Sequence, residues 1–204
     1  MNRTDLTKFI ATRFDGVVVS GNAVATHLRR EFIGISPHQI RLAIEGLSRM
    51  NPGSFGGSLR YETIAGVRCG IVNYNRIGKK RDLILWIHGG AFTFGSAKVY
   101  RAAAVHLAKS LECEIVIPEY RLSPENVFPA AIDDVLSVYL DLIDSDGYIP
   151  VIGDSAGGNL AACLVQKCIK EGMAIPTKLA LLSPWVDLSK GSKSNKKNKN
   201  DFSP

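Results

Sequence analysis

The stretch Val151-Ile152-Gly153-Asp154-Ser155-Ala156-Gly157-Gly158-Asn159-Leu160 decides the fold of this 204-residue chain. A short apolar strand runs into a Gly-x-Ser-x-Gly turn, and a helical pattern follows at once. A serine on such a turn has a strained backbone that pushes its Oγ out above the sheet, and a Cβ on either flanking glycine would collide with neighbouring segments. The N-terminus of the following helix favours a developing oxyanion. Ser155 is therefore the candidate nucleophile, and Gly153, Asp154 and Gly157 are candidates for shaping its turn.

From the usual frequency of glycine, a bare Gly-x-Ser-x-Gly arises by chance in roughly several per cent of chains of this length, so the motif needs independent support. A second glycine element provides it. His88-Gly89-Gly90-Ala91-Phe92 directly follows the apolar run Leu83 to Ile87. Two adjacent glycines leave the backbone bare, so the N–H groups of Gly89 and Gly90 can approach a substrate oxygen, with the N–H of Ala156 opposite. Gly89-Gly90 on its own is equally typical of a flexible loop. Together the two elements predict an oxyanion hole at Gly89, Gly90 and Ala156.

Strands and helices alternate from residue 82 onward, after two strands that precede them. This order predicts an α/β fold with a mostly parallel central sheet flanked by helices, whose ligands bind at the carboxyl ends of the strands. The predicted strands are Leu59 to Ile64, Val67 to Tyr74, Leu83 to Ile87, Glu112 to Pro118, Val151 to Asp154 and Leu179 to Ser183, and the predicted helices are Lys98 to Leu111, Phe128 to Ile143 and Ala156 to Ile169.

Three segments are predicted along the chain. Residues 1–50 are helical in pattern, most clearly from Ser36 as N-cap with Pro37 at the first helical position, and less clearly over Val24 to Phe32. Residues 51–189 form the α/β core. Residues 190–204 form a basic flexible tail, because they carry five lysines against one aspartate.

Composition excludes several function classes. That tail holds most of the net charge of +6, so the nearly neutral body does not predict a nucleic-acid partner. The four cysteines lack metal-ligand spacing, and we expect buried free thiols, no metal and no cofactor. No signal peptide and no segment of about 18 apolar residues is recognisable, so we expect a cytoplasmic protein without stable membrane insertion.

The motifs of the core resemble those of the hormone-sensitive lipase family of α/β-hydrolases, in particular its bacterial esterases. The resemblance covers about residues 60 to 190. It implies hydrolysis of carboxylic esters or lactones, a helical cap that includes residues 1–50, Ser155 as nucleophile, and an oxyanion hole at Gly89, Gly90 and Ala156. It also implies that His88 shapes its loop and is not the general base. The stretches that carry it are His88 to Ala91, Tyr120 to Glu125, Phe128 to Ala131, Asp133-Asp134, Gly153 to Asn159 and Ser183 to Leu188.

The family's triad acid and histidine follow the serine in the chain, whereas all four histidines here, His27, His38, His88 and His106, precede Ser155. Because a serine without a base is a weak nucleophile, we expect a C-terminally truncated relative that has little activity alone. Three hypotheses follow: a serine esterase by descent, a catalytically dead fragment or small-molecule-binding pseudoenzyme, and one part of a split enzyme complemented by a C-terminal polypeptide that carries the later strands.

Overall fold

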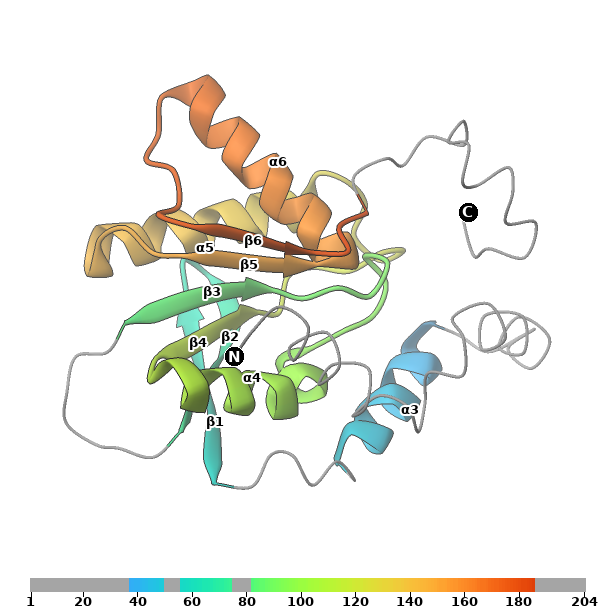
Figure 1. Cartoon of the computed structure of the whole chain (residues 1–204). Coiled ribbons are helices and arrows are strands. Elements are labelled where there is room, and N and C mark those ends of the chain that lie inside the picture. The colour runs from blue at the N-terminus through green and yellow to red at the C-terminus, as the bar shows by residue number, and fades with distance from the viewer. Residues whose placement is uncertain (1–36, 50–55, 75–81, 186–204) are drawn as a thin grey trace. The chain divides into compact units, whose positions relative to one another are not determined.

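The computed structural model describes residues 37–49, 56–74 and 82–185, and their element order matches the predicted alternation (Figure 1). The helices are α3 (Pro37–Arg49), α4 (Ala97–Leu111), α5 (Ala130–Asp146) and α6 (Ser155–Glu171), and the strands are β1 (Gly57–Ile64), β2 (Val67–Tyr74), β3 (Leu83–Ile87), β4 (Glu114–Pro118), β5 (Val151–Asp154) and β6 (Leu179–Leu182).

The strands form one sheet in the order β1-β2-β4-β3-β5-β6. β1 and β2 are joined by a hairpin, and β2 pairs antiparallel with β4, while β4, β3, β5 and β6 run parallel. The arrowheads of the parallel strands therefore point to the same edge in Figure 1. The register between β3 and β5 pairs Ile87 with Gly153, so the two segments that follow these strands leave the sheet side by side. The predicted fold class is confirmed.

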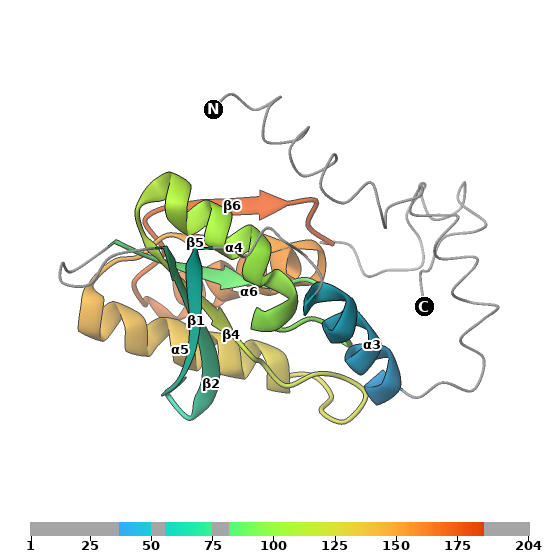
Figure 2. The same cartoon turned by 90° about the horizontal axis from the view of Figure 1, so that it is seen from below.

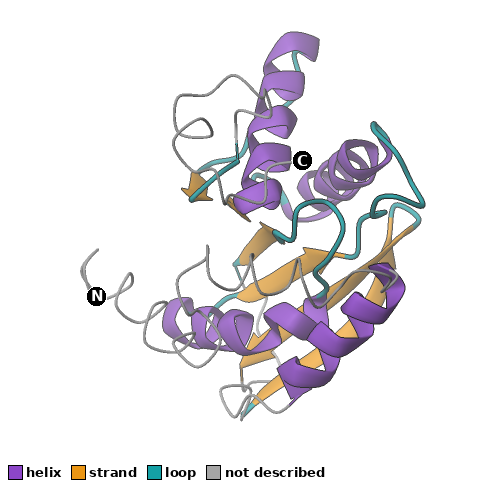
Figure 3. Ribbon diagram, turned by 90° about the vertical axis from the view of Figure 1, so that its right-hand side faces the viewer, coloured by secondary structure: helices purple, strands orange, loops and turns teal. Residues whose placement is uncertain are grey.

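Helices cover both faces of the sheet (Figure 3). On one face, α4 packs its small residues Ala104 and Ala108 against the strand residues Trp86 and Ile115. On the other face, α5 and α6 bury larger side chains such as Tyr139 and Leu164 against Leu85 and Val116. β3 and β4 lie in the middle of the sheet and are buried on both faces, which explains their unbroken apolar sequences.

Local signals set the helix ends. The Ser96 side chain accepts a hydrogen bond from the Val99 N–H at the start of α4, and Gly172 ends α6 in the left-handed region at φ 68°. Glu112, predicted as the first residue of a strand, instead ends α4 in the left-handed region at φ 52°. The predicted boundary was wrong because the apolar run Cys113 to Ile117 was extended backwards over a helix cap.

Two further features bear on the site. α3 packs beside α4 near the loops at the carboxyl end of the strands (Figure 2). β6 is the last strand of the described sheet, and Leu179 and Leu181 are exposed on it. Of the four cysteines, which are all free, Cys163 is only partly buried, which corrects the expectation of four buried thiols. Among the described helices, none has the length and apolar character needed to cross a membrane.

Several predictions concern residues outside the described ranges. They are the helix over Val24 to Phe32, the N-cap at Ser36, the tail at 190–204, the position of His27, and the end of the motif stretch Ser183 to Leu188 beyond residue 185. The proposed segments 1–50, 51–189 and 190–204 therefore stay predictions, although Pro37–Arg49 is helical.

Candidate active site

The turn between β5 and α6 has the strained geometry that its sequence predicts. Ser155 has a φ of 50°, which a non-glycine residue rarely adopts, and the N–H of Trp185 donates to its carbonyl oxygen at 2.9 Å. A Cβ on Gly153 would overlap the carbonyl of Gly157, and a Cβ on Gly157 would overlap the backbone of Ile87. Both positions therefore require glycine because other backbone segments approach closely.

The loop after β3 lies directly against this turn. A Cβ built on Gly89 would stand 2.8 Å from the Asp154 carbonyl oxygen and 3.1 Å from the Ser155 Cβ. The two glycine elements, which lie far apart in the sequence, thus meet at the carboxyl ends of neighbouring parallel strands. This meeting is the arrangement on which the sequence interpretation depended.

Gly89 differs from its predicted role as an oxyanion donor. Its N–H donates inside the protein, to the Asp154 carboxylate at 3.1 Å and to the Tyr100 hydroxyl at 2.9 Å, so it is not free to bind a substrate oxygen. Among the described residues, the N–H groups of Gly90 and Ala91 have no hydrogen-bond partner. Within the described ranges, the N–H groups of this loop without a partner are therefore those of Gly90 and Ala91, whereas the sequence analysis named Gly89 and Gly90.

Asp154 joins three elements through its carboxylate. Its Oδ1 accepts from the Trp86 indole at 3.0 Å and from the Gly89 N–H, and its Oδ2 accepts from the Tyr100 hydroxyl at 2.6 Å. Asp154 occupies the N-cap position of α6, but its side chain makes no capping hydrogen bond. The first N–H groups of α6, including that of Ala156, therefore have no side-chain cap, and a helix N-terminus of this kind binds anions.

His88 is a structural residue of the same loop. Its ring is 1% exposed and stacks on Tyr120 with ring centroids 4.3 Å apart. Its Nδ1 lies 2.8 Å from the Gly89 carbonyl oxygen, and because a carbonyl only accepts, the proton sits on Nδ1. Burial lowers the pKa of His88 to about 4, so the imidazole is neutral near pH 7. The Tyr120 hydroxyl donates to the His88 carbonyl at 2.8 Å, which fixes the backbone of the loop as well.

The segment after β4 forms a second loop at the same edge. Arg121 donates to both carboxylate oxygens of Asp134 on α5, with a shortest distance of 2.7 Å, and its own N–H donates to the same carboxylate. Asp134 is buried, so this contact anchors the start of α5 to the end of β4. Arg121 and Asp134 of this motif thus hold the scaffold.

Two aromatic rings lie beside the Ser155 turn. The rings of Phe92 and Trp185 stack with centroids 6.2 Å apart, and both are partly exposed. Asn159 on α6 donates to the Trp185 carbonyl at 2.9 Å, which fixes the segment after β6 against α6. An apolar surface therefore adjoins Ser155 and the free N–H groups of the neighbouring loop.

A general base does not contact Ser155 within the part of the chain that the structure describes. His38 lies exposed on α3, His106 lies on α4, and the imidazole of His88 is held against Gly89 and Tyr120. The described site therefore contains a serine on a strained turn and N–H donors for an anion, which are two of the three parts that acyl transfer needs.

Comparison with known proteins agrees with this geometry. Residues 84–203 match the sequence profile of the family described as alpha/beta hydrolase fold. An esterase of Acinetobacter venetianus is 32% identical over 166 residues, which make up 79% of this chain and 54% of the esterase. Neutral cholesterol ester hydrolase 1 of Rattus norvegicus is 41% identical over 98 residues, which make up 43% of this chain and 24% of that hydrolase.

Solved structures are similar over most of the chain. The crystal structure of a hormone-sensitive lipase from a metagenome library is 34% identical with a TM-score of 0.75, and the match covers 82% of this chain and 57% of that structure. A bacterial esterase of the hormone-sensitive lipase family has a TM-score of 0.74 at 25% identity, with 87% and 62% covered. This chain spans about half the length of the relatives it matches. It belongs to the alpha/beta hydrolase fold family and, within that family, to the hormone-sensitive lipase group.

Proposed function

We propose that this chain provides the nucleophile and the oxyanion hole of a serine hydrolase that cleaves carboxylic esters or lactones. The observation that carries the proposal is the close approach of the strained Ser155 turn to the loop of Gly90 and Ala91, whose N–H groups are free. Esterases among the relatives support the ester class of substrate.

In the proposed reaction, the Ser155 Oγ attacks the ester carbonyl carbon and transfers its proton to a base. The N–H groups of Gly90, Ala91 and Ala156 bind the oxyanion, where each such donor is worth about 100- to 1000-fold in rate. The bond to the alcohol oxygen then breaks, the base returns the proton to the leaving alcohol, and an acyl-enzyme on Ser155 remains. Water hydrolyses this ester in a second round of the same steps.

We further propose that the base is a histidine, paired with an acid, that lies outside this 204-residue sequence. The sequence has no histidine after Ser155, and the neutral His88 is held within its own loop. A longer form of the chain or a second polypeptide that pairs with the exposed strand β6 would provide both residues. A cytoplasmic location also stays part of this proposal.

Acylation by p-nitrophenyl butyrate, followed by intact-protein mass spectrometry, tests the nucleophile directly. Because deacylation also needs a base, we expect one butyryl group to accumulate on Ser155, with slow p-nitrophenol release that added imidazole accelerates. Ser155→Ala should abolish labelling, whereas the control Ser137→Ala, an exposed serine on α5, should leave it unchanged.

Labelling that persists in Ser155→Ala would contradict the nucleophile, and turnover at ordinary esterase rates by this chain alone would contradict the external base. The intact loop of His88 to Ala91 favours one other function, a binding protein for a small ester or lactone that does not turn it over. Saturable binding of p-nitrophenyl butyrate that survives Ser155→Ala, without acylation of the parent chain, would identify that case.

A further inference from the structure

Arg41 connects α3 to two loops that lie far from it in the sequence. Its Nε donates to the Thr93 carbonyl at 2.6 Å, and its Nη2 donates to the Ser123 carbonyl at 2.6 Å. Its two terminal nitrogens also bind the Glu125 carboxylate at 3.0 and 2.9 Å. Only 21% of the Arg41 side chain is exposed, and its contacts with the two carbonyls are partly buried, whereas the Glu125 side chain is 51% exposed.

Thr93 belongs to the loop that carries the free N–H groups. The N–H groups of Thr93 and Phe94 both donate to the Gly90 carbonyl, at 2.9 and 2.8 Å, and so close a turn around Ala91. Ala91 and Phe92 have φ values of 51° and 58°. Such left-handed conformations are strained for residues other than glycine and persist only where neighbouring groups hold them.

The loop after β4 supports this turn from the other side. The Ser123 N–H donates to the Phe92 carbonyl at 2.8 Å, and Arg41 binds the Ser123 carbonyl. The guanidinium therefore binds both sides of the contact between the two loops. A planar fork of five donors suits this task, since a lysine ammonium presents its donors from one point.

We propose that Arg41 is a positioning residue, which holds the loop of Gly90 and Ala91 in the conformation that presents its free N–H groups. Through Arg41, α3 and the loop of Gly90 and Ala91 then move as one unit. The catalytic consequence rests on the proposed hydrolase function, but the effect on loop conformation does not.

Another interpretation is that Arg41 only attaches α3 to the core. The structure offers a matched control, because the Lys98 ammonium on α4 lies 3.2 Å from the Glu45 carboxylate on α3. That ion pair also attaches α3, but it does not contact the loop of Gly90. A variant of Glu45 therefore loosens α3 without removing a hydrogen bond from the loop.

Hydrogen–deuterium exchange of the full chain separates the two interpretations. In Arg41→Met we expect the amides of Thr93, Phe94 and Ser123 to exchange at least about tenfold faster. Their segments lose hydrogen bonds to a charged group, and the free energy of such bonds is large enough to change the population of the open loop by this factor. Arg41→Lys should give an intermediate rate. Glu45→Gln should leave these amides within about twofold of the parent chain.

Amides of β5 serve as the internal reference for global stability in each variant. Unchanged loop exchange in both Arg41 variants, or equal acceleration in Glu45→Gln, would overturn the proposal. If the reference amides of Arg41→Met also exchange faster, that variant has lost global stability. The test then rests on whether Arg41→Lys accelerates the loop amides while the β5 amides stay unchanged. Where ester turnover is measurable, Arg41→Lys should lower kcat with little change in KM, because the oxyanion exists only in the transition state. If Ser155 is not labelled but the Arg41 variants exchange their loop amides faster, the hydrolase function is rejected and the positioning role of Arg41 stands.

Discussion

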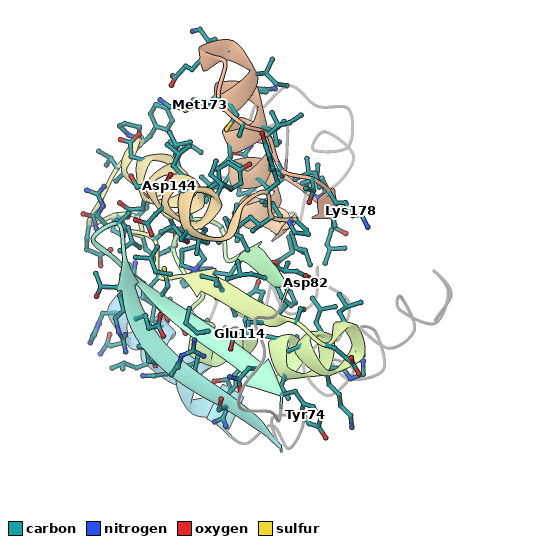
Figure 4. The ribbon with its side chains drawn as sticks, turned by 90° about the vertical axis from the view of Figure 1, so that its left-hand side faces the viewer. Tyr74, Asp82, Glu114, Asp144, Met173 and Lys178 are labelled. Carbon is teal, nitrogen blue, oxygen red and sulfur yellow. The ribbon has the colours of Figure 1, made fainter. Side chains whose placement is uncertain are left out.

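The two edges of the sheet at which the parallel strands end and begin differ in how they hold polar groups. At the carboxyl edge, His88 is buried and the Asp154 carboxylate accepts three hydrogen bonds from inside the protein. At the opposite edge, shown in Figure 4, Asp82 and Lys178 are exposed where β3 and β6 begin, and Glu114 binds Arg60 in contact with water.

Backbone strain follows the same division. Six non-glycine residues of the described chain have a positive φ, and four of them follow β3, β5 or β6 at the carboxyl edge: Ala91, Phe92, Ser155 and Ser183. The others, Ala65 and Glu112, lie in a hairpin turn and at a helix end. Backbone hydrogen bonds close the turn around Ala91 and bind the carbonyls of Phe92 and Ser155, and such support is the physical requirement for a preorganised site. Four substitutions test this difference, in order of decreasing expected effect.

The largest effect is expected from Gly157→Ala. The new Cβ would overlap the backbone of Ile87 and His88, which cannot move without separating α6 from β3. We expect the free energy of unfolding to fall by about 3 kcal/mol or more in chemical denaturation. Gly46→Ala on α3 is the control, because its Cβ meets nothing and should stabilise the chain by about 1 kcal/mol. Equal changes in the unfolding free energy of the two variants would mean that the close approach of backbone segments at Gly157 is not what requires glycine there.

Asp154→Ala is expected to cost about 2 to 3 kcal/mol. It leaves the donors of Trp86, Gly89 and Tyr100 without their carboxylate in a partly buried site. The matching change at the other edge, Glu114→Ala, should cost less than about 1 kcal/mol, since water can replace its contacts with Arg60 and Asn73. Urea unfolding of both variants measures the difference, and a larger loss at Glu114 would reverse the comparison.

The pH dependence of stability isolates His88. Its pKa of about 4 in the folded chain lies below the ordinary 6.5, so between these values the unfolded chain binds the extra proton. The contribution of the neutral His88 to the free energy of unfolding is fully present above the pKa of the unfolded chain. It is lost as the pH falls toward the pKa of the folded chain, by about 2 kcal/mol between about pH 7 and pH 5. In His88→Asn, which keeps a donor for the Gly89 carbonyl, this part of the pH slope should disappear. An unchanged slope would show that His88 is not buried as a neutral ring.

The smallest effect is expected from Tyr120→Phe, which removes the hydroxyl that donates to the His88 carbonyl. The ring stacking on His88 remains, so the loss should be about 1 kcal/mol in thermal or urea unfolding. An equal loss in Tyr148→Phe, where the ring is exposed at the opposite edge, would show that burial of the hydroxyl is not the cause.

Sequence reasoning predicted the elements well because their signals are local. The predicted strands Leu59 to Ile64 and Val67 to Tyr74, the buried apolar strands and the Ser155 turn each follow from a few neighbouring residues. Donor roles were harder to predict. Whether the N–H of Gly89 or of Ala91 is free depends on Asp154 and Tyr100, which reach the loop from other elements.

The sequence by itself determined the parallel α/β alternation and the glycine positions of the Ser155 turn, because spacing and residue size specify them directly, and its motifs resemble those of the family. The tertiary structure alone decided which N–H groups remain free, where the Asp154 carboxylate points, and that Arg41 on α3 reaches the loop of Gly90. Each of these depends on hydrogen bonds between residues that are more than 50 positions apart, or on a helix side chain meeting a distant loop, and no local pattern encodes such partners.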